Sequence, residues 1–523
     1  MIDLIQWNKV PAMAGNRLFL DYVDGQQRAL AYYTQGPRDF YAALEARRNH
    51  PYPRAGLAQC LAEYNQRLGA SPQTMENIAA LARPDAFCVV GGQQAGFMGG
   101  PAYVAYKIDC TIQLARRLAD TLGVTVVPVF WLASEDHDFG EINHAHVVQP
   151  DGEIGRVSFD WNEKGRPIAD LSITDAVREA VAAYWRTGRP GPDADRVRSL
   201  TEPRGSRYCD WLAALWLQLF AQDGLVVLEP ATVRPLAGEL FSSALSQRDK
   251  IGSQLKAVAE RLTVDGYTPL LDPETAGTLY TFEADGRRVR VSDPVAAASE
   301  AATHPERFST DAALRPLLAD STLPVLASTL GAGELAYQGM LRPLYEQFGI
   351  PQPVCYPRAS YTILSAAEQE RLAAYGLHPL DVLSHEVEID STMRRLMPAA
   401  ELERFARARE GVGEALNPLR GYLEELDPNL VKSWEQGLAS AVRNIDKMEE
   451  RAINVTLSRG GYSRRELQAL RNMMLPRGRL QERVLPVTHM LQHYGMGFLS
   501  QLRAVGEPEA FGHAIVTLEE LHA

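Results

Sequence analysis

The chain has 523 residues, which is too long for one compact core, so we expect two to four domains. Its composition is that of a globular protein, and a formal net charge of −12 argues against general binding to nucleic acid or an anionic membrane. The chain does not open with a basic stretch followed by an apolar one, and its longest apolar run, residues 123–133, is too short to span a bilayer. We therefore expect a cytoplasmic protein with neither nucleic-acid nor membrane partners.

The first 84 residues are predicted to form a helical segment packed on a core. Apolar residues recur at three- and four-residue spacing in 55–70 and again in 71–85. Ser71 and Pro72 are suited to cap the second of these helices and to begin its first turn.

From Ala86 the pattern changes to short apolar runs that alternate with helical stretches. The runs are AFCVVGG, VTVVPVFWLA, DGLVVLEP, LPVLAST and PVCYPRAS. Apolar strands alternating with helices are typical of a parallel sheet covered on both faces. Residues 85–375 are therefore predicted to form an α/β, Rossmann-like core.

Two stretches interrupt this alternation, at about 151–205 and 258–315, and we interpret both as insertions between strands of the core. The second contains TLYTFEADGRRVRVSD, which predicts a β-hairpin with Asp285 and Gly286 at its turn.

Residues 376–510 are predicted to form a helical domain. Apolar residues alternate steps of three and four over 412–430 and again over 438–455, which is typical of a coiled-coil seam. The proline-containing break at 427–429 predicts two helices that fold back on each other, followed by C-terminal helices.

The five cysteines are scattered along the chain and odd in number. They form no CxxC pair or other metal-ligand spacing. We expect reduced, mostly buried thiols at Cys60, Cys88, Cys110, Cys209 and Cys355.

The first polar cluster is the glycine-rich turn GGQQAGFMGGP at residues 91–101, directly after a predicted strand. Gln93 and Gln94 offer side-chain donors and acceptors, and Gly96 lets the backbone approach a ligand closely. The turn is neither a Walker loop nor a GxGxxG fingerprint, so it does not by itself indicate a phosphate site. A tight strand-to-helix turn without a ligand is the alternative.

The second cluster, SEDHDFGEINH at residues 134–144, follows the next strand. Glu135, Asp136 and Asp138 flank His137, and such a group can move protons near neutral pH. Asn143 lies just beyond. The alternatives are a solvated acidic loop, a magnesium site on the carboxylates, or a zinc site built from His137, His144 and His146.

The third cluster is LGAGELAYQG at residues 330–339, which again joins a strand to a helix. Gly331 and Gly333 leave room for a ligand, and Glu334 and Tyr337 share one helix face. Arg358, after the last strand, is suited to grip a carboxylate through its fork of N–H donors. The alternatives are a helix-capping glutamate and a structural arginine.

Five blocks carry a family resemblance: GGQQAGFMGGPAYVAYK, VPVFWLASEDHDFGEINH, GAGELAYQGML, YPRASYTIL and the later LQERV…YG segment. In this order, from about residue 86 to 495, they resemble the bacillithiol-biosynthesis cysteine-adding enzymes. The resemblance implies a Rossmann-like core with two connecting-peptide insertions, an α-helical coiled-coil domain and a homodimer. It also implies the activity: a ligase that joins the carboxylate of L-cysteine to the amine of glucosaminyl-malate in the last step of bacillithiol biosynthesis.

For this reaction we expect His137, tuned by Asp136 and Asp138, to be the base that frees the attacking amine. Arg358 is expected to hold the malate carboxylates. The remaining substrate-binding candidates are Gln93, Gln94, Gly96, Glu135, Asn143, Gly331, Gly333, Glu334 and Tyr337.

By resemblance to synthetases with similar cores, ATP with magnesium is expected to activate the cysteine carboxylate. No organic prosthetic group and no resident metal are expected. The chain departs from those synthetases in having no HIGH-type or KMSKS-type signature, which leaves the energy source and its binding site open. Trp434, Arg483 and Tyr494 are candidates for nucleotide contacts, with packing or ion pairing as the alternative.

Two other functions fit the same residues. One is an adenylating ligase or nucleotidyltransferase that acts on another amino acid, which a substrate panel would separate. The other is a non-catalytic coiled-coil scaffold whose sheet domain binds a metabolite, although three polar clusters at strand ends argue against it.

Overall fold

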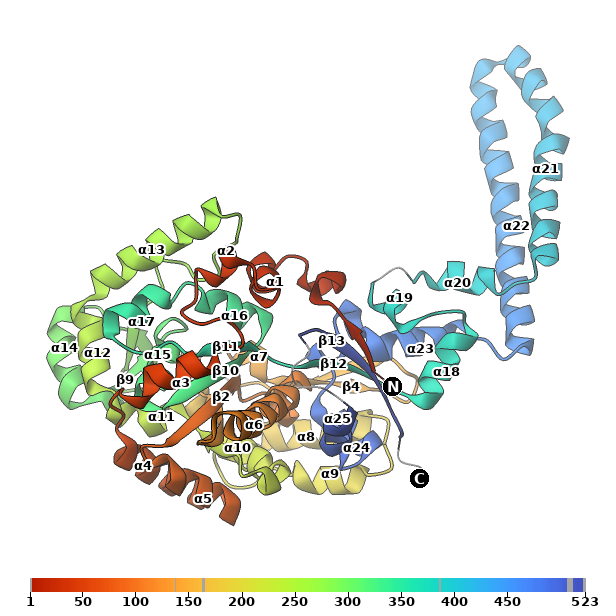
Figure 1. The fold of residues 1–523 in the computed structure, drawn as a ribbon. Helices are drawn as coiled ribbons and strands as arrows, with labels where there is room; N and C mark the ends of the chain where they lie inside the picture. Colours follow the sequence, from red (N-terminus) through yellow and green to blue (C-terminus); the bar gives the residue numbers. More distant parts are fainter. Residues whose placement is uncertain (1, 137, 162–164, 385–386, 506–510, 521–523) are drawn as a thin grey trace. The chain divides into compact units, whose positions relative to one another are not determined.

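The computed structural model describes residues 2–136, 138–161, 165–384, 387–505 and 511–520. It divides into two compact units (Figure 1). The larger unit is built from residues 1–150, 154–365 and 479–523, and the smaller one from 151–153 and 366–478.

A five-stranded parallel sheet forms the centre of the larger unit. Its strands, in spatial order, are β11 (Val354–Pro357), β10 (Val325–Leu330), β2 (Ala86–Gln94), β3 (Thr125–Ala133) and β6 (Val226–Leu228). The chain continues from β2 to β3 on one side of the sheet and from β10 to β11 on the other. The predicted Rossmann-like core is therefore confirmed, and β2 and β10 lie at the point where the strand order reverses.

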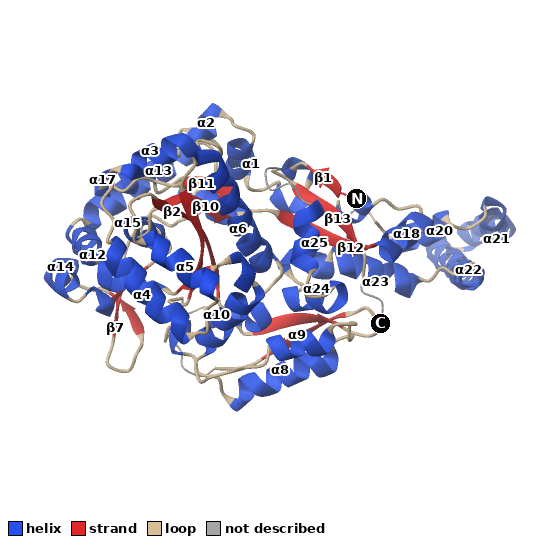
Figure 2. Ribbon diagram, turned by 60° about the horizontal axis from the view of Figure 1, so that its bottom comes forward, coloured by secondary structure: helices blue, strands red, loops and turns tan. Residues whose placement is uncertain are grey.

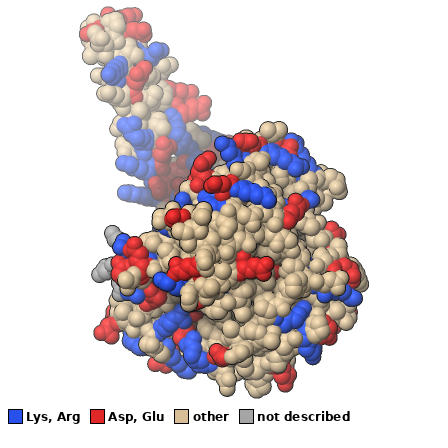
Figure 3. All heavy atoms as spheres, turned by 90° about the vertical axis from the view of Figure 1, so that its left-hand side faces the viewer, with Lys and Arg blue, Asp and Glu red and all other residues tan. Residues whose placement is uncertain are grey.

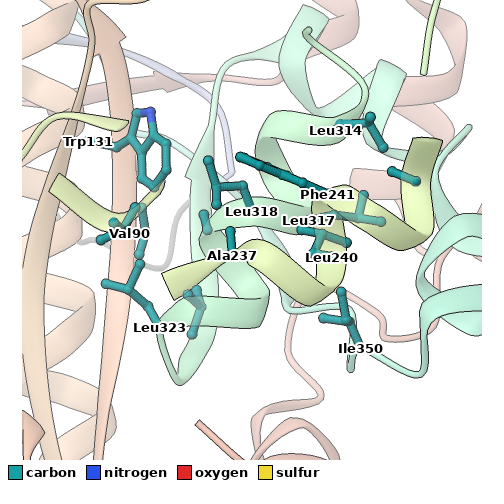
Figure 4. Packing of buried hydrophobic residues seen from close by; sticks show 14 of the residues in the cluster. Val90, Trp131, Ala237, Leu240, Phe241, Leu314, Leu317, Leu318, Leu323 and Ile350 are labelled. Carbon is teal, nitrogen blue, oxygen red and sulfur yellow. The ribbon is translucent and has the colours of Figure 1, made fainter. Parts of the chain in front are cut away.

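Both faces of this sheet are buried, because successive side chains of a strand point to opposite sides. On β2, Phe87 and Val89 face one apolar cluster, whereas Cys88 and Val90 face the other. Figure 4 shows the second cluster, in which Val90 and Trp131 pack near leucines of α15 (Leu314–Thr322). This burial explains why the strands are continuous apolar runs rather than alternating ones.

Helices lie on both sides of the sheet (Figure 2). The first cluster takes residues from α3 (Phe40–Arg48) and α6 (Tyr103–Leu122). The second takes residues from α4 (Arg54–Arg67), α5 (Pro72–Leu81), α11 (Pro230–Val233), α12 (Gly238–Ser246), α13 (Arg248–Val264), α14 (Pro294–Thr303), α15 and α17 (Arg342–Phe348). The remaining helices of this part of the unit are α1 (Arg17–Val23), α2 (Gln27–Leu30), α7 (Phe139–Ile142), α10 (Tyr208–Leu219) and α16 (Ala332–Gln338).

The two predicted insertions contain small elements of their own. The first includes β5 (Ile154–Ser158), which pairs antiparallel with β4 (His144–Val148), and the helices α8 (Asp175–Thr187) and α9 (Ala194–Leu200). The second includes a sheet of β8 (Arg288–Arg290), β7 (Leu279–Phe282) and β9 (Phe308–Thr310). The predicted hairpin is confirmed, with Gly286 in its turn at φ 84°.

A separate three-stranded sheet joins the two ends of the chain. Strand β1 (Ile2–Ile5) pairs antiparallel with β13 (His513–Leu518), which pairs parallel with β12 (Ser360–Ser365). The C-terminal segment also contributes α24 (Val487–Tyr494) and α25 (Phe498–Val505) to the larger unit. The sequence predicted neither β1 nor β13.

The smaller unit is helical, and its two long helices form the predicted coiled coil. These are α21 (Ala399–Leu426) and α22 (Val431–Arg459), which run side by side in Figure 1. The indole Nε1 of Trp434 donates to the carbonyl of Leu416 at 2.7 Å, which ties one helix to the other. The other helices are α18 (Ala366–Ala374), α19 (Pro379–Leu383), α20 (Ile389–Arg395) and α23 (Arg464–Met474).

The surface charges and the cysteines are arranged as the composition predicts. Within the described residues, no helix is both long and apolar enough to cross a membrane. Acidic and basic side chains are interspersed on the face shown in Figure 3. All five cysteines are free thiols; Cys60 is partly exposed and the other four are buried, as predicted.

Candidate active site

A cavity of about 460 Å³ opens beyond the carboxyl ends of β2, β3 and β10. This is the place where open parallel sheets bind ligands, at the reversal of strand order. Five predicted site residues line it: Gln93, Gln94, Asp136, Glu334 and Tyr337. The structure therefore brings together residues from all three polar clusters of the sequence.

A buried lysine lies beneath these residues. Lys107, on α6, is 1% exposed, and its Nζ donates to the carbonyl of Gly92 at 2.8 Å and to Oε1 of Gln93 at 2.9 Å. Its third contact is Oε2 of Glu334, at 2.6 Å. Burial lowers the pKa of the ammonium, and the carboxylate of Glu334 partly offsets this effect. Lys107 thus links β2 to the helix that follows β10.

Glu334 lies in the first turn of α16 and is held as an anion. Its Oε2 also accepts from the backbone N–H of Gly331 at 2.6 Å, so the helix-capping interpretation of Glu334 is confirmed. Burial acts to raise the pKa of this carboxyl, but Lys107, the Gly331 N–H and the nearby Arg315 outweigh it, and the net pKa lies below the usual value. The side chain is still 27% exposed. One carboxylate therefore both caps a helix and lines the cavity.

The two glutamines at the end of β2 have fixed orientations. Gln93 Oε1 accepts from Lys107, which leaves its amide N–H groups to other partners. Gln94 Nε2 donates to Oδ2 of Asp136 at 2.8 Å, across the ends of β2 and β3. Asp136 Oδ1 also accepts from the backbone N–H of Asp138 at 3.2 Å. These bonds hold the Asp136 carboxylate at the edge of the cavity.

An arginine completes the opposite wall. Arg315, near the start of α15, donates from Nη2 to the hydroxyl of Tyr337 at 3.3 Å. Burial disfavours its charge, but Tyr337, Glu334 and Asp136 stabilise the cation and raise its pKa overall. Burial likewise raises the pKa of Tyr337, against the pull of Arg315. The cavity thus has carboxylates and a cation on facing walls.

The glycine-rich turn owes its residues to close backbone packing. A Cβ at Gly96 would lie 2.7 Å from the Cα of Gly100, which itself has φ 71°. A Cβ on Gly91 would lie 2.4 Å from Oγ1 of Thr111. The tight-turn interpretation is therefore supported for Gly96, which is not among the residues that line the cavity.

The residues of the acidic cluster at 134–144 lie in different surroundings. His137 lies outside the described residues, so its predicted role as base, and the predicted zinc alternative, stay predictions. Asp138 is exposed. Glu135 is buried and pairs with Arg234 Nε at 3.1 Å. Asn143 Nδ2 donates to the carbonyl of Phe159 at 3.1 Å, which ties it to the strand β4–β5 region.

Arg358 is engaged within the protein. Its Nη1 and Nη2 lie 3.1 Å and 2.6 Å from the two carboxylate oxygens of Glu482. Both side chains are buried, at 6% and 1% exposure, and the guanidinium stacks over the ring of Tyr103. The structural-arginine alternative is therefore supported by these contacts. A grip on a substrate carboxylate stays a prediction.

The three candidates for nucleotide contacts lie in different surroundings. Trp434 belongs to the coiled coil of the smaller unit, whereas Arg483 and Tyr494 belong to the larger unit. The guanidinium of Arg483 lies 5.8 Å from the ring centre of Tyr103. Tyr494 is buried, with its ring 5.8 Å from that of Phe498. Their part in nucleotide binding stays a prediction.

Lys107 and Arg315 are among the residues of this site that sequence reasoning missed. Lys107 had a usable signal, because it interrupts the apolar face of a helix directly after the glycine-rich turn. Arg315 had none, since it depends on how α15 packs against α16.

The cavity offers carboxylates that could bind a cation carried by a nucleotide. Among the described residues, no group of three or more His, Cys, Asp or Glu side chains could hold a metal ion. Magnesium usually binds one or two carboxylates together with substrate phosphates. Asp136 and Glu141 line the same cavity and could supply such ligands.

Comparison with known proteins accounts for almost the whole chain. Residues 5–359 match the family described as "Bacillithiol biosynthesis BshC, N-terminal Rossmann-like domain", and residues 361–518 match its "C-terminal coiled-coil domain". A protein of Geobacillus thermodenitrificans is 31% identical, over 97% of this chain and 99% of its own length. One of Geobacillus kaustophilus is 32% identical over the same shares, and one of Salinibacter ruber is 30% identical over 95% and 96%. All three carry the name "Putative cysteine ligase BshC".

The two matched domains follow each other along the chain as the parallel-sheet core and the coiled coil do in the structure. The resemblance found in the five sequence blocks is thereby confirmed. The chain belongs to the BshC family of bacillithiol biosynthesis.

Proposed function

We propose that this protein is a ligase that joins the carboxylate of L-cysteine to the amine of glucosaminyl-malate, giving bacillithiol. The observation that carries the proposal is the cavity at the strand reversal, where Gln93, Gln94, Asp136, Glu334 and Tyr337 meet in a chain of this family. Relatives named cysteine ligases support the reaction class.

The reaction forms a C–N bond, expels one oxygen of the cysteine carboxylate and removes a proton from the attacking amine. Asp136 is the described carboxylate best placed to take that proton, because it lines the cavity and Gln94 holds it in position. His137, next in the chain, is proposed to share this role. Gln93 and Tyr337 orient polar groups of the substrates, and Lys107 keeps Gln93 and Glu334 fixed.

A carboxylate oxygen is a poor leaving group, and ATP with magnesium is proposed to activate the carboxylate when bound. The expelled oxygen would then leave on the phosphate or the nucleoside monophosphate released from ATP. Glu141, which lines the same cavity, is the carboxylate we propose for the cation, together with phosphates of the nucleotide. The proposal includes no prosthetic group.

The test is a mass-spectrometric assay of the purified protein with glucosaminyl-malate and cysteine, with and without Mg-ATP. We expect bacillithiol only when Mg-ATP is added. A panel of other amino acids separates this activity from that of an adenylating ligase of different specificity. Folded protein that yields no product in any combination would contradict the proposal.

A further inference from the structure

A second cavity adjoins the first. It has a volume of about 310 Å³ and shares Ala133, Asp136, Ala312 and Arg315 with the cavity described above. Its far side is formed by the small sheet of the second insertion, which contributes Arg288 and Arg290 from β8 and Tyr280 from β7. The insertion therefore completes a compartment that the parallel sheet alone does not have.

Three arginines face this compartment, and their observed hydrogen bonds end on neutral oxygens. Arg288 donates to Ser309 Oγ at 2.9 Å and to the Thr310 carbonyl at 2.6 Å. Arg290 donates to the Thr275 carbonyl at 3.2 Å, and Arg315 to the Tyr337 hydroxyl. None of these acceptors carries a charge, although Glu135 and Asp136 lie near enough to stabilise the cations of Arg288 and Arg315. Guanidinium groups bonded only to neutral acceptors are suited to bind an anion as well.

Two of the carboxylates that line this compartment have partners outside the three arginines. Glu135 pairs with Arg234, and Asp311 accepts four backbone N–H groups, from Gly277, Thr278, Ala313 and Leu314. Neither carboxylate forms a hydrogen bond with Arg288, Arg290 or Arg315 among the described residues, although Glu135 stabilises the Arg288 cation electrostatically.

Arg288 is also held in a single orientation. Its guanidinium lies 3.9 Å from the ring centre of Tyr280, in addition to its two hydrogen bonds to β9. A planar guanidinium fixed in this way is suited to a carboxylate, which it can bind through two parallel N–H donors.

We propose that this second cavity binds a small dicarboxylate group through Arg288 and Arg315, with Arg290 at its rim. On the proposed function, that group is the malyl part of glucosaminyl-malate. The sugar carries its amine on the carbon next to the one that bears the malyl group. A malyl group in the second cavity therefore places the amine at the shared boundary, where Asp136 lies, and leaves the first cavity to cysteine.

The experiment measures binding and kinetics of the full chain with three variants. Arg288→Gln and Arg315→Gln remove the charges, and Arg287→Gln is the matched control. Arg287 is adjacent to Arg288 but is 53% exposed and pairs with Glu283 and Asp285. Calorimetry with glucosaminyl-malate and with L-malate should show about 10- to 100-fold weaker binding for the first two variants, and no change for the control.

In the assay of bacillithiol formation, the KM of Arg288→Gln for glucosaminyl-malate should rise by a similar factor. Its KM values for cysteine and ATP should stay within about threefold of those of wild type. A rise confined to cysteine or to ATP would assign the cavity to another anion and overturn the proposal, as would no change at all. Arg288→Lys keeps the positive charge but loses the paired N–H donors of the guanidinium, so its loss of affinity should lie between those of wild type and Arg288→Gln. This variant also serves as a check in case Arg288→Gln fails to fold. If wild-type protein binds glucosaminyl-malate but makes no bacillithiol, the proposed function fails while the calorimetry still decides the cavity.

Discussion

The Nζ atom of Lys107 lies 2.6 Å from Oε2 of Glu334, and this ion pair joins α6 to the start of α16 at the reversal of the strand order. The lysine is almost fully buried, so its charge depends on that carboxylate and on the oxygens of β2. The pair therefore fixes the floor of the cavity in one arrangement.

Replacing Lys107 by Met should destabilise the protein by about 3 kcal/mol, because Glu334 then keeps a largely buried charge without its partner. The double variant Lys107→Met with Glu334→Gln should recover part of that loss. Urea unfolding followed by tryptophan fluorescence measures both. Equal stability of the single variant and wild type would show that the pair contributes little.

Asp136→Asn should lower kcat by roughly 10²-fold, since the amide cannot accept the amine proton. His137→Ala is expected to lower turnover by roughly the same factor if it shares this role. Asp85→Asn, at a carboxylate that is 66% exposed, is the control and should retain wild-type turnover. Wild-type kcat in a folded Asp136→Asn variant would exclude Asp136 as the base.

Stability should depend on pH through Asp320, which lies in the cavity floor beside Tyr345. Burial raises the pKa of this carboxyl to about 7 from an ordinary 3.8. Between these values the folded state holds a proton that the unfolded state has lost, so the contribution is complete below pH 3.8 and is lost as the pH rises through 7.

The variant Asp320→Asn removes this titration while keeping the shape of the side chain. Its Tm should therefore fall less than that of wild type between pH 5 and pH 8, with a difference of several degrees. Calorimetric scans across that range test the expectation. Parallel pH profiles for the two proteins would mean that Asp320 titrates normally.

The sequence predicted that Arg358 holds the malate carboxylates, and its pairing with Glu482 allows that role to be tested. Glu482→Gln should cost about 3–5 kcal/mol of stability, because it leaves a buried guanidinium without its anion. Arg358→Met combined with Glu482→Gln should be more stable than the single change. If Arg358 instead binds substrate, Arg358→Lys should raise the KM for glucosaminyl-malate while leaving the Tm near that of wild type.

Most of the site could be predicted because it depends on one local rule. Parallel strands end at the same edge of a sheet, so polar residues at the end of β2 and shortly after β3 and β10 had to come together there. Gln93, Asp136 and Glu334 follow this rule and line one cavity.

The residues that sequence reasoning missed depend on contacts between distant segments. Lys107 and Arg315 reach the cavity from helices, and no periodicity of a single helix shows which neighbour it will face. The same holds for Glu482, whose partner lies more than a hundred residues earlier in the chain. Nothing in the local sequence marks Glu482 as buried, although its side chain is 1% exposed.

The small sheet that holds both ends of the chain has a consequence for biogenesis. Strand β1 emerges from the ribosome among the first residues, but β13, which supplies its hydrogen-bonded neighbour, follows only at His513–Leu518. At synthesis rates of about 5–20 residues per second, β1 waits roughly 25–100 seconds for that partner. During this interval β1 has no partner strand, so we expect its edge to be open to pairing with other chains until β13 has been made.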